Sequence, residues 1–298
     1  MMNFLRPATY FFAISAILTI VSVVLFITPG PAFSIEFTGG TRMDIRVLDE
    51  TKTKADVQSA FSSFEAAELS PIVNSGEDRR FIVRMRGIDN EQHTALLAHL
   101  SGTLGAVEEQ QFTTIGPTVG DTLKVRAIYA LIVASLGIIL YIAFVFRKIP
   151  RKYSPWKFGV TAVATLLHDI MITVGIMTIV SWYTSFEIDT LFVTALLTIL
   201  GYSVNDTIIV FDRIRDNLAD DMHRQSFAEL SNAAVNQTWK RSFYTSFSTL
   251  IMLFALFFMG SSSIMWFVLT LIIGISLGTY SSIFVAMPLL VLWSKRSK

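Results

Sequence analysis

The sequence predicts an α-helical polytopic membrane protein with six transmembrane helices and one external α+β domain between the first and second helix. Of the 298 residues, 52% are hydrophobic and only 16% are charged, whereas about 25% are charged in an ordinary soluble domain. Long apolar stretches recur along the chain, and the acidic residues are concentrated in one segment. Residues 30–123 carry 8 basic and 14 acidic side chains, a net charge of −6, against +7 for the remainder.

Six apolar stretches are long enough to cross a bilayer, because a hydrocarbon core about 30 Å thick needs roughly 20 residues of helix. They are Pro7–Thr28, Ala127–Phe146, Phe158–Phe186, Thr190–Phe211, Ser242–Ser263 and Ile264–Trp293. The first lacks the small-residue cleavage site of a signal peptide, so we expect residues 1–29 to remain as a transmembrane helix. Residues 124–298 then form a region of five further helices. The last stretch is overlong and must tilt, or continue along the interface past Pro288.

The basic residues near the ends of these stretches predict the orientation, because loops rich in Lys and Arg stay in the cytoplasm. Arg6, the loops 147–157 and 213–241 and the C-terminal tail together hold 14 basic residues. The short loops that would lie on the opposite side hold none. We therefore expect both termini in the cytoplasm and residues 30–123 outside.

The external segment is expected to form a small domain with the element order βαββαβ. The predicted strands are Thr41–Leu48, Leu69–Asn74, Arg80–Arg86 and Val107–Ile115, and the predicted helices are Lys54–Glu68 and Asn90–Leu100. The second and third strands can pair as a hairpin around Asn74-Ser75-Gly76. This order is that of the split βαβ, ferredoxin-like unit.

Asp206 lies inside the fourth apolar stretch, four or five residues before its cytoplasmic end. A charge within a span costs about 2.5–3.5 kcal/mol even on lenient scales, so it is a candidate for function. Tyr202 and Ser203 lie one turn earlier on the same face, and Asn205 is adjacent. This polar stripe suits a helix–helix contact or a wet cavity. The alternative is a carboxylate that only marks a fraying helix end.

A second polar stripe crosses the middle of the third stretch. Thr165, Asp169 and Thr173 are spaced at i, i+4 and i+8 and therefore share one helix face. Hydrogen bonding between helices and proton handling by Asp169 both explain this pattern. The adjacent His168 is expected to point about 100° away from Asp169, as an interhelix donor.

Arg241 opens the fifth stretch, near the same membrane face as Asp206. Arg241 and Lys240 can both be interface anchors that extend to the cytoplasm. Alternatively, Arg241 meets Asp206, with Ser242, Thr245, Ser246 and Thr249 extending a hydroxyl-rich face inward. Burial and a guanidinium act on a carboxyl group in opposite senses, so such a contact would make protonation of Asp206 a switch.

No enzyme signature is present. The sequence has no cysteine, which excludes disulfides, thiol nucleophiles and thiolate metal sites. It also lacks the His-Glu-x-x-His, Gly-x-Ser-x-Gly and Gly-x-x-x-x-Gly-Lys motifs, and the glycines of Phe37-Thr-Gly-Gly-Thr41 precede a strand rather than a helix. The net charge of +1 gives no indication of nucleic acid. We expect no enzymatic activity, cofactor or metal, and energy from an ion gradient.

Several stretches resemble the signature blocks of the SecF family, subunits of the bacterial Sec translocation machinery. The most specific resemblance is Gly201–Asn217, whose Asn-Asp pair favours SecF over the sister subunit SecD. Further blocks are Ile35–Thr41, Ile115–Gly120, Leu167–Thr173 and Asn236–Arg241. Ser34 and Glu36 replace the usual Gly and Asp of the first of these, and Trp239-Lys240 is bulkier and more basic than the family pattern.

The resemblance implies one six-helix half of an RND-type transporter in the bacterial inner membrane, which requires a partner half. It implies action with a SecD-like subunit beside the SecYEG channel, driven by the proton-motive force, to assist preprotein translocation. It also implies that Asp206 and Arg241 belong to the proton pathway, with Asp169 as a further candidate. A half-size RND exporter of lipid or drug and a purely structural scaffold are alternatives. The residues leave H⁺ and Na⁺ open as coupling ions.

Overall fold

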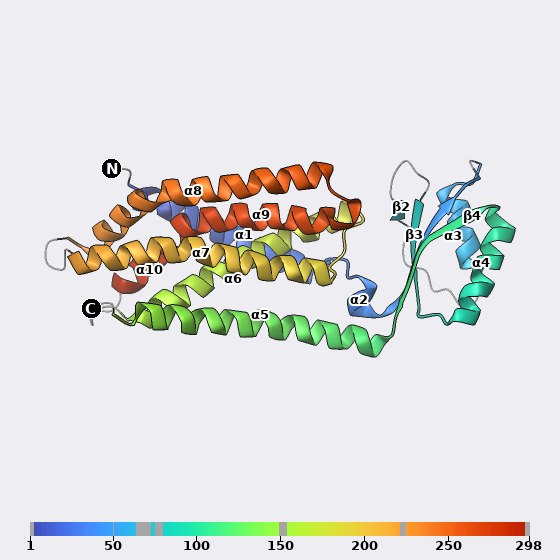
Figure 1. Cartoon of the computed structure of the whole chain (residues 1–298), viewed down its shortest axis with the longest axis horizontal. Coiled ribbons are helices and arrows are strands. Elements are labelled where there is room, and N and C mark those ends of the chain that lie inside the picture. Colours follow the sequence, from blue (N-terminus) through green and yellow to red (C-terminus); the bar gives the residue numbers. More distant parts are fainter. Residues whose placement is uncertain are drawn as a thin grey trace. The chain divides into compact units, whose positions relative to one another are not determined.

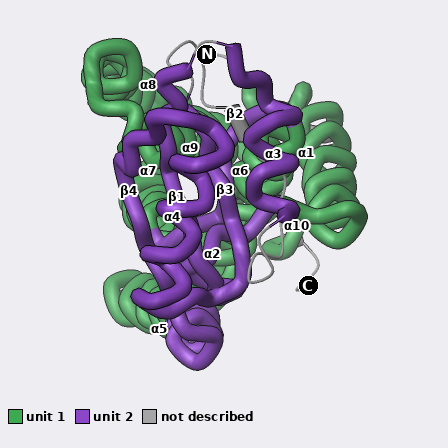
Figure 2. Tube along the Cα trace, turned by 90° about the vertical axis from the view of Figure 1, so that its right-hand side faces the viewer, with its two compact units in different colours: residues 1–31, 129–182, 191–298 green, residues 32–128, 183–190 purple. Residues whose placement is uncertain are grey.

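The computed structural model of the chain describes residues 3–49, 51–63, 73–74, 80–148, 154–220 and 225–295. These residues form two compact units (Figure 2). The membrane unit contains residues 1–31, 129–182 and 191–298, and the external unit contains residues 32–128 and 183–190. The short segment 183–190 between two membrane helices therefore belongs to the external unit.

Six helical spans are long and apolar enough to cross a membrane, as predicted (Figure 1). They are α1 (Leu5–Ile27), α5 (Pro117–Val145), α6 (Pro155–Tyr183), α7 (Thr190–Asp220), α8 (Phe227–Met259) and a sixth span made of α9 (Met265–Ser281), the π-helical turn η3 (Ser282–Ala286) and α10 (Met287–Lys295). Short 3₁₀ turns, η1 (Phe146–Lys148) and η2 (Ser262–Ile264), follow α5 and precede α9. The wider turn lies just before Pro288, which has no N–H for the carbonyl one turn earlier.

Most of the described part of segment 213–241, expected as a loop, is helical, because α7 and α8 continue beyond their apolar parts. Ion pairs one turn apart support the extension of α7, with Arg215 Nη2 at 2.7 Å from Asp212 Oδ1. A capping box of Ser226 and Glu229 begins α8. The prediction from hydropathy placed the ends of α7 and α8 at the first charged residues. The helical periodicity continues through those residues, and so do the helices.

Glycines allow three close approaches between the membrane helices. A Cβ on Gly278 of α9 would lie 2.8 Å from the Cβ of Ser203 on α7, and one on Gly274 would overlap the side chain of Ile199. Gly175 of α6 faces Ser22 of α1 in the same way. The Gly274–Gly278 spacing is the small-xxx-small pattern that brings membrane helices together, and it holds α9 directly against the part of α7 that precedes Asp206.

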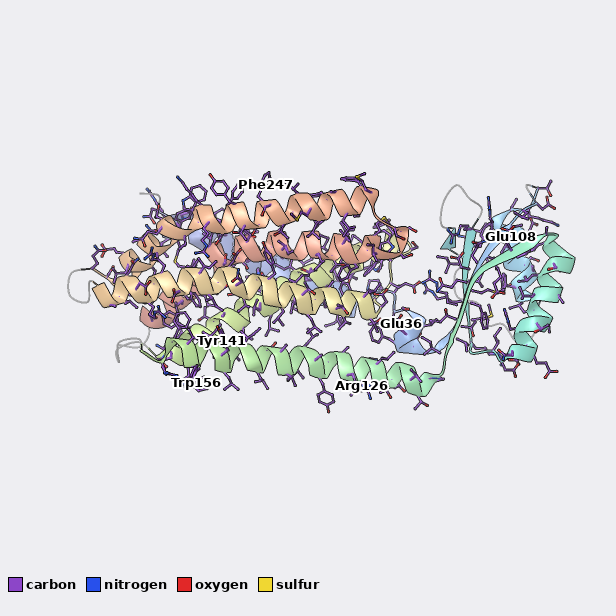
Figure 3. All side chains as sticks on the ribbon, viewed as in Figure 1. Glu36, Glu108, Arg126, Tyr141, Trp156 and Phe247 are labelled. Carbon is purple, nitrogen blue, oxygen red and sulfur yellow. The ribbon has the colours of Figure 1, made fainter. Side chains whose placement is uncertain are left out.

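The outward surface of the membrane unit is apolar. Large side chains on α1, α5 and α8 are exposed, including Tyr141 and Phe247, which are 59% and 53% exposed (Figure 3). α6, in contrast, is mostly buried. An exposed apolar surface of this kind requires lipid or another membrane protein around it.

The external unit is a four-stranded antiparallel sheet with two helices, in the predicted order βαββαβ. The strands β1 (Gly40–Val47), β2 (Val73–Asn74), β3 (Arg80–Met85) and β4 (Val107–Ile115) lie in the order β2-β3-β1-β4, and the helices are α3 (Lys54–Ser62) and α4 (Asn90–Leu104). The predicted end of the first helix at 64–68, the start of the predicted second strand at 69–72 and the turn residues 75–76 lie outside the described residues. A short helix that was not predicted, α2 (Ile35–Thr38), precedes β1.

Alternation along β1 and β3 divides the sheet into two faces. One face packs against α3 and α4 and holds the domain core, which includes Met43, Ile45, Val57, Phe61, Phe81, Val83, Leu96 and Leu100. The opposite face carries Arg42, Asp44 and Arg84, and the register places Arg42 directly across from Arg84. Two guanidinium groups in this position repel each other unless an anion lies near them.

Candidate functional site

Asp206 is buried in the membrane unit, with only 1% of its surface exposed. Its Oδ2 accepts a hydrogen bond of 3.3 Å from Ser246 Oγ of α8, and the hydroxyls of Ser242 and Thr279 also face the carboxylate. Its Oδ1 and the Ser242 Oγ are buried without a hydrogen-bond partner among the described residues. Oδ1 therefore has unused hydrogen-bonding capacity, and the Ser242 hydroxyl is a group that can donate to it or accept from it.

The hydroxyl groups around Asp206 form a connected chain across three helices. Thr279 Oγ1 of α9 donates to Ser246 Oγ at 2.6 Å, and Ser246 in turn donates to Asp206. Tyr202, one turn before Asp206 on α7, donates to Thr249 Oγ1 of α8 at 3.2 Å. Hydroxyls that both donate and accept can pass a proton along such a chain.

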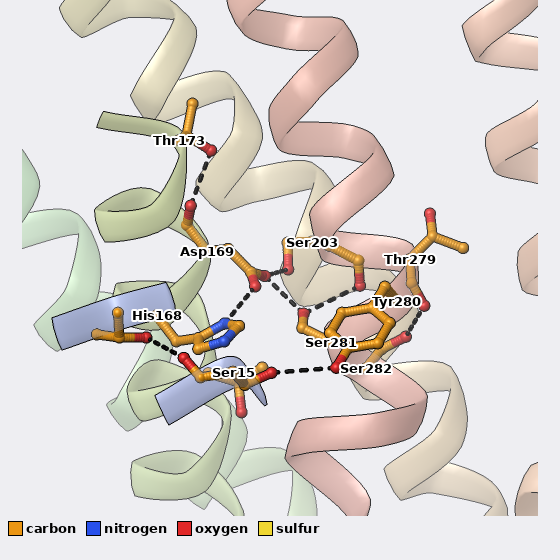
Figure 4. Close-up of polar contacts among 12 residues, drawn as sticks. Ser15, His168, Asp169, Thr173, Ser203, Thr279, Tyr280, Ser281 and Ser282 are labelled. Carbon is orange, nitrogen blue, oxygen red and sulfur yellow. Dashed lines mark hydrogen bonds and ion pairs between the residues drawn. The ribbon is translucent and has the colours of Figure 1, made fainter. Parts of the chain in front are cut away.

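Asp169 of α6 is completely buried and its carboxylate is fully hydrogen bonded (Figure 4). Its Oδ2 accepts from Ser203 Oγ of α7 and from Ser281 Oγ of α9, both at 2.7 Å. Its Oδ1 lies 2.9 Å from Nδ1 of His168. Asp169 therefore joins α6, α7 and α9, and it differs from Asp206, which has an unpaired oxygen.

The expectation that His168 points away from Asp169 is wrong. The 100° rotation between neighbouring residues applies to their Cα–Cβ bonds, and the ring of His168 turns back along α6 to reach the Asp169 carboxylate. Its Nε2 is buried without a hydrogen-bond partner among the described residues. The His168 side chain is 10% exposed, so this ring belongs to the polar interior of the membrane unit.

The remaining predicted stripe residues differ in their positions. Thr165 and Thr173 are buried, but their hydroxyls donate to the carbonyls of Thr161 and Asp169 on their own helix. They bond to the backbone of α6, and among the described residues they make no hydrogen bond to a neighbouring helix. Asn205 is exposed on α7 and does not join the site.

Arg241 is exposed on α8, and no ion pair joins it to Asp206 in the part of the chain that the structure describes. The predicted inward face of α8 is divided between two sides of the helix. Ser242 and Ser246 are buried against Asp206, whereas Arg241 and Thr245 lie on the exposed side. One residue of helix rotates a side chain by about 100°, which is enough to separate Arg241 from its buried neighbour.

Two site residues, Thr279 and Ser281 of α9, were not predicted from the sequence, and neither was the pairing of His168 with Asp169. Thr279, Ser281 and Ser282 form a hydroxyl-rich run in an otherwise apolar span. This run could have identified them as candidates for the polar interior. Among the described residues, no group of three or more His, Cys, Asp or Glu side chains could hold a metal ion. The site thus consists of two carboxylates, one imidazole and hydroxyl groups.

The comparisons with known proteins agree with this architecture. The family model for the protein export membrane protein SecD/SecF, C-terminal, matches residues 96–296. Protein translocase subunit SecF of Thermobaculum terrenum is 38% identical and aligns over 99% of this chain and 95% of its own length. The SecF of Desulfurispirillum indicum is 36% identical, over 98% of this chain and 92% of its own.

A fused relative is also similar over the whole of this chain. Protein translocase subunit SecDF of Thermus thermophilus is 35% identical over 99% of this chain, which spans only 39% of the relative. The crystal structure of SecDF from that organism superposes with a TM-score of 0.83 at 32% identity, again over 39% of that chain. This chain therefore corresponds to one part of that longer polypeptide. The chain belongs to the SecD/SecF family of protein export membrane proteins, a family of protein translocase subunits.

Proposed function

We propose that this protein is the SecF-type half of a proton-driven accessory to the Sec translocase, and that Asp206 takes up and releases the coupling proton. The observation that carries the proposal is the buried, incompletely bonded carboxylate of Asp206 beside the unpaired hydroxyl of Ser242. A buried carboxylate with free bonding capacity is costly as an anion. Taking up a proton lowers that cost, and the changed bonding alters the contact of α7 with α8 and α9.

Asp169 has a different role in this proposal. Its carboxylate is already satisfied by Ser203, Ser281 and His168, so it holds three helices in register around the site. It stays on the proton pathway as the neighbouring carboxylate, since Ser203 lies one turn before Asp206 on α7. Proton uptake at Asp206 and the bonding of Asp169 are thus linked through one turn of helix.

A partner half is supported by polar groups on the outer surface of the membrane unit. Thr194, Thr198, Gly201 and Asn205 are exposed along one side of α7, with spacings of four, three and four residues. Small and polar side chains on a membrane helix pack against another helix rather than lipid. The SecDF relative indicates which protein the partner is. Its name includes SecD, and this chain matches only 39% of its length. We propose that a SecD-like subunit covers this stripe and the exposed Arg241.

In the cell, we propose a bacterial inner-membrane location with both termini in the cytoplasm and the external unit in the periplasm. The SecYEG channel and the translocating preprotein would be the further partners, in contact with the external unit. A proton that crosses the membrane supplies about 2.3 kcal/mol per 100 mV. That is sufficient to bias two arrangements of a helix pair.

The proposal is tested by Asp206→Asn, which preserves the shape of the side chain but cannot ionise. In inverted vesicles that contain SecD, SecYEG and this protein, we expect normal assembly and loss of the translocation increment that depends on the proton-motive force. Asp212→Asn is the matched control, because Asp212 lies on the same helix but is 46% exposed at its side chain. Applying proton and sodium gradients separately identifies the coupling ion. Unchanged proton-dependent activity in Asp206→Asn would falsify the proposal.

The role of Arg241 is tested separately with Arg241→Met and Lys240→Met. Both side chains are exposed at the same level of α8, so loss of an interface anchor should affect them equally. If Arg241 meets the partner half, Arg241→Met impairs proton-dependent translocation and Lys240→Met does not.

Co-purification distinguishes the translocase from the RND exporter. If the chain is purified without SecD or SecYEG and exports a small molecule, the exporter is favoured instead.

A further inference from the structure

The segment between α6 and α7 is bound into the external unit by its backbone. Ile188 forms a parallel β-bridge with Phe33. Ser34 N donates to the carbonyl of Ile188 at 2.9 Å, and Ile188 N donates to the carbonyl of Ala32 at 2.8 Å. The side chains of Phe186 and Ile188 are 2% and 7% exposed. This connection is therefore an integral part of the external unit, rather than a free loop between two helices.

A buried ion pair fixes the same segment to the sheet. Glu187 is 8% exposed, and its Oε1 pairs with Nη2 of Arg84 on β3. Arg84 stands directly across from Arg42 of β1. Burial, with a smaller contribution from Arg42, lowers the pKa of Arg84 to about 10, so Arg84 is still a cation at neutral pH. Glu187 supplies a negative charge to one of these two facing guanidinium groups, which reduces their mutual repulsion.

A third contact completes the first turn of α7. Glu36 Oε2 of α2 accepts a 2.7 Å hydrogen bond from the backbone N–H of Thr190, the first residue of α7. The first turn of α7 has no acidic residue of its own. A helix N-terminus has unsatisfied N–H groups and a partial positive charge, and here the capping carboxylate comes from a remote part of the external unit.

The position of Glu36 depends on the two glycines that follow α2. Gly39 and Gly40 have φ values of +72° and +120°, and a Cβ on Gly40 would lie 2.7 Å from the Met85 carbonyl oxygen. Only glycine fits both the backbone angle and the space. The chain can therefore turn from α2 directly into β1, which leaves Glu36 beside Thr190.

We propose that Glu36, Arg84 and Glu187 are positioning residues that couple the membrane carboxylates to the external unit. We call these three residues, together with Ala32–Ser34 and segment 183–190, the α6–α7 tether. The tether joins the C-terminal end of α6 to the N-terminal end of α7. Asp169 lies within α6, and Asp206 lies within α7. A displacement of either helix along its axis is passed to the external unit as long as the tether stays closed. This inference rests on the proposed function, because it assumes that Asp206 drives such a displacement.

The experiment measures proton-dependent translocation in the same vesicles for Arg84→Gln, Glu187→Gln and the charge swap Arg84→Glu with Glu187→Arg. Each single variant should lose most of the proton-dependent increment, while the swap should recover it, because a carboxylate and a guanidinium again face each other at positions 84 and 187. Arg80→Gln is the matched control. It removes the 3.2 Å pair with Asp44 on the same sheet face and leaves the residues of the tether unchanged, and it should retain the increment.

A disulfide separates coupling from simple loss of folding. The chain has no cysteine, so Phe33→Cys with Ile188→Cys gives one defined pair at bridge partners, within the separation that a disulfide spans. When oxidised, this pair should leave the wild-type increment unchanged and restore it in Arg84→Gln, and reduction should remove the rescue. Protease resistance of the external unit should be the same in all variants.

Three results would overturn the tether. The first is full activity of Arg84→Gln and Glu187→Gln. The second is that neither the charge swap nor the disulfide restores the proton-dependent increment. The third is that the oxidised cysteine pair blocks translocation in the otherwise wild-type chain, which would show that the tether must open. Asp206→Asn, measured in parallel, identifies the failing step. If it loses the increment while the tether variants keep theirs, only the tether is wrong; if it keeps the increment, both proposals fail.

Discussion

The hydroxyl of Ser203 on α7 donates a 2.7 Å hydrogen bond to the Asp169 carboxylate of α6, one helical turn before Asp206. The two buried carboxylates are therefore not independent, because the same turn of α7 presents a donor to one of them and carries the other. α9 repeats this arrangement, with Thr279 directed to the Asp206 side and Ser281 to Asp169. Any change in the position of α7 alters the bonding of both groups.

Ser203→Ala should destabilise the membrane unit. It removes one of two donors to the buried Oδ2 of Asp169, and an incompletely satisfied buried acceptor costs about 1–3 kcal/mol. The free energy of unfolding in mixed detergent micelles measures the effect. Thr198→Ala is the control, because Thr198 is exposed on the same helix and bonds only its own backbone. Equal stability of the two variants would contradict the role given to the Asp169 contact.

Ser246→Ala should reduce proton-dependent translocation with little change in the amount of assembled protein. Ser246 is the donor to Asp206 and the acceptor from Thr279, so its removal interrupts the hydroxyl chain. Ser248→Ala should have no effect, because Ser248 is exposed and bonds the carbonyl of Thr245 on its own helix. The translocation increment per unit of imposed proton gradient is the quantity to compare.

Gly278→Ala should displace α9 from α7 at the level of the site. The added Cβ would lie 2.8 Å from that of Ser203, and overpacking of this kind costs about 1–3 kcal/mol. We expect lower thermal stability together with impaired proton coupling. Gly201→Ala, whose added Cβ has no atom within 4 Å, should leave the thermal stability of the purified chain without its partners unchanged. A neutral result for Gly278→Ala would mean that the close contact of α7 and α9 is dispensable.

The external unit should lose protection around α3 as the pH falls. The backbone and side chain of Thr53 donate to Asp56 and hold the pKa of that carboxyl below its usual 3.8. A carboxyl with a lowered folded-state pKa contributes stability above the unfolded-state pKa and loses it as pH drops through the folded-state value. Hydrogen exchange of the α3 amides in the full chain, from about pH 7 to about pH 3, measures this loss.

In Asp56→Asn the pH-dependent part of that protection should be absent throughout the range. Glu108→Gln, which removes an exposed carboxylate from β4, should leave the α3 profile unchanged. If the hydrogen-exchange protection of α3 in the wild type does not change across the acidic range, the capping box of Thr53 and Asp56 does not determine the stability of α3.

The spans and the external domain could be predicted because their patterns are local. Apolar length identifies the six spans, and the alternation of Met43, Ile45 and Val47 identifies β1 without knowledge of its neighbours. The helical extension around Asp212 and Arg215 was missed because hydropathy treats charges as an end, although pairs one turn apart continue a helix.

The site could be predicted only in part, for the same reason. The solvation cost of a charge in a span identifies Asp206 and Asp169 from their positions alone. Their partners, such as Ser246 and Ser281, depend on the rotation of other helices about their axes, which no local pattern contains. Of the two alternatives for Arg241, the structure shows the exposed one, since a rotation of one residue places Ser242 rather than Arg241 at the buried site.

The cap that Glu36 provides for Thr190 spans 154 residues of sequence, and this has a consequence for biogenesis. The ribosome releases the anchor and the outer domain long before α7, and domains generally fold as units in order of synthesis. Glu36 can cap the first turn of α7 only when the domain that holds it has already folded. The helix that carries Asp206 therefore acquires the cap at its start from a domain that was made much earlier, so misfolding of that domain would leave the first turn of α7 without this carboxylate.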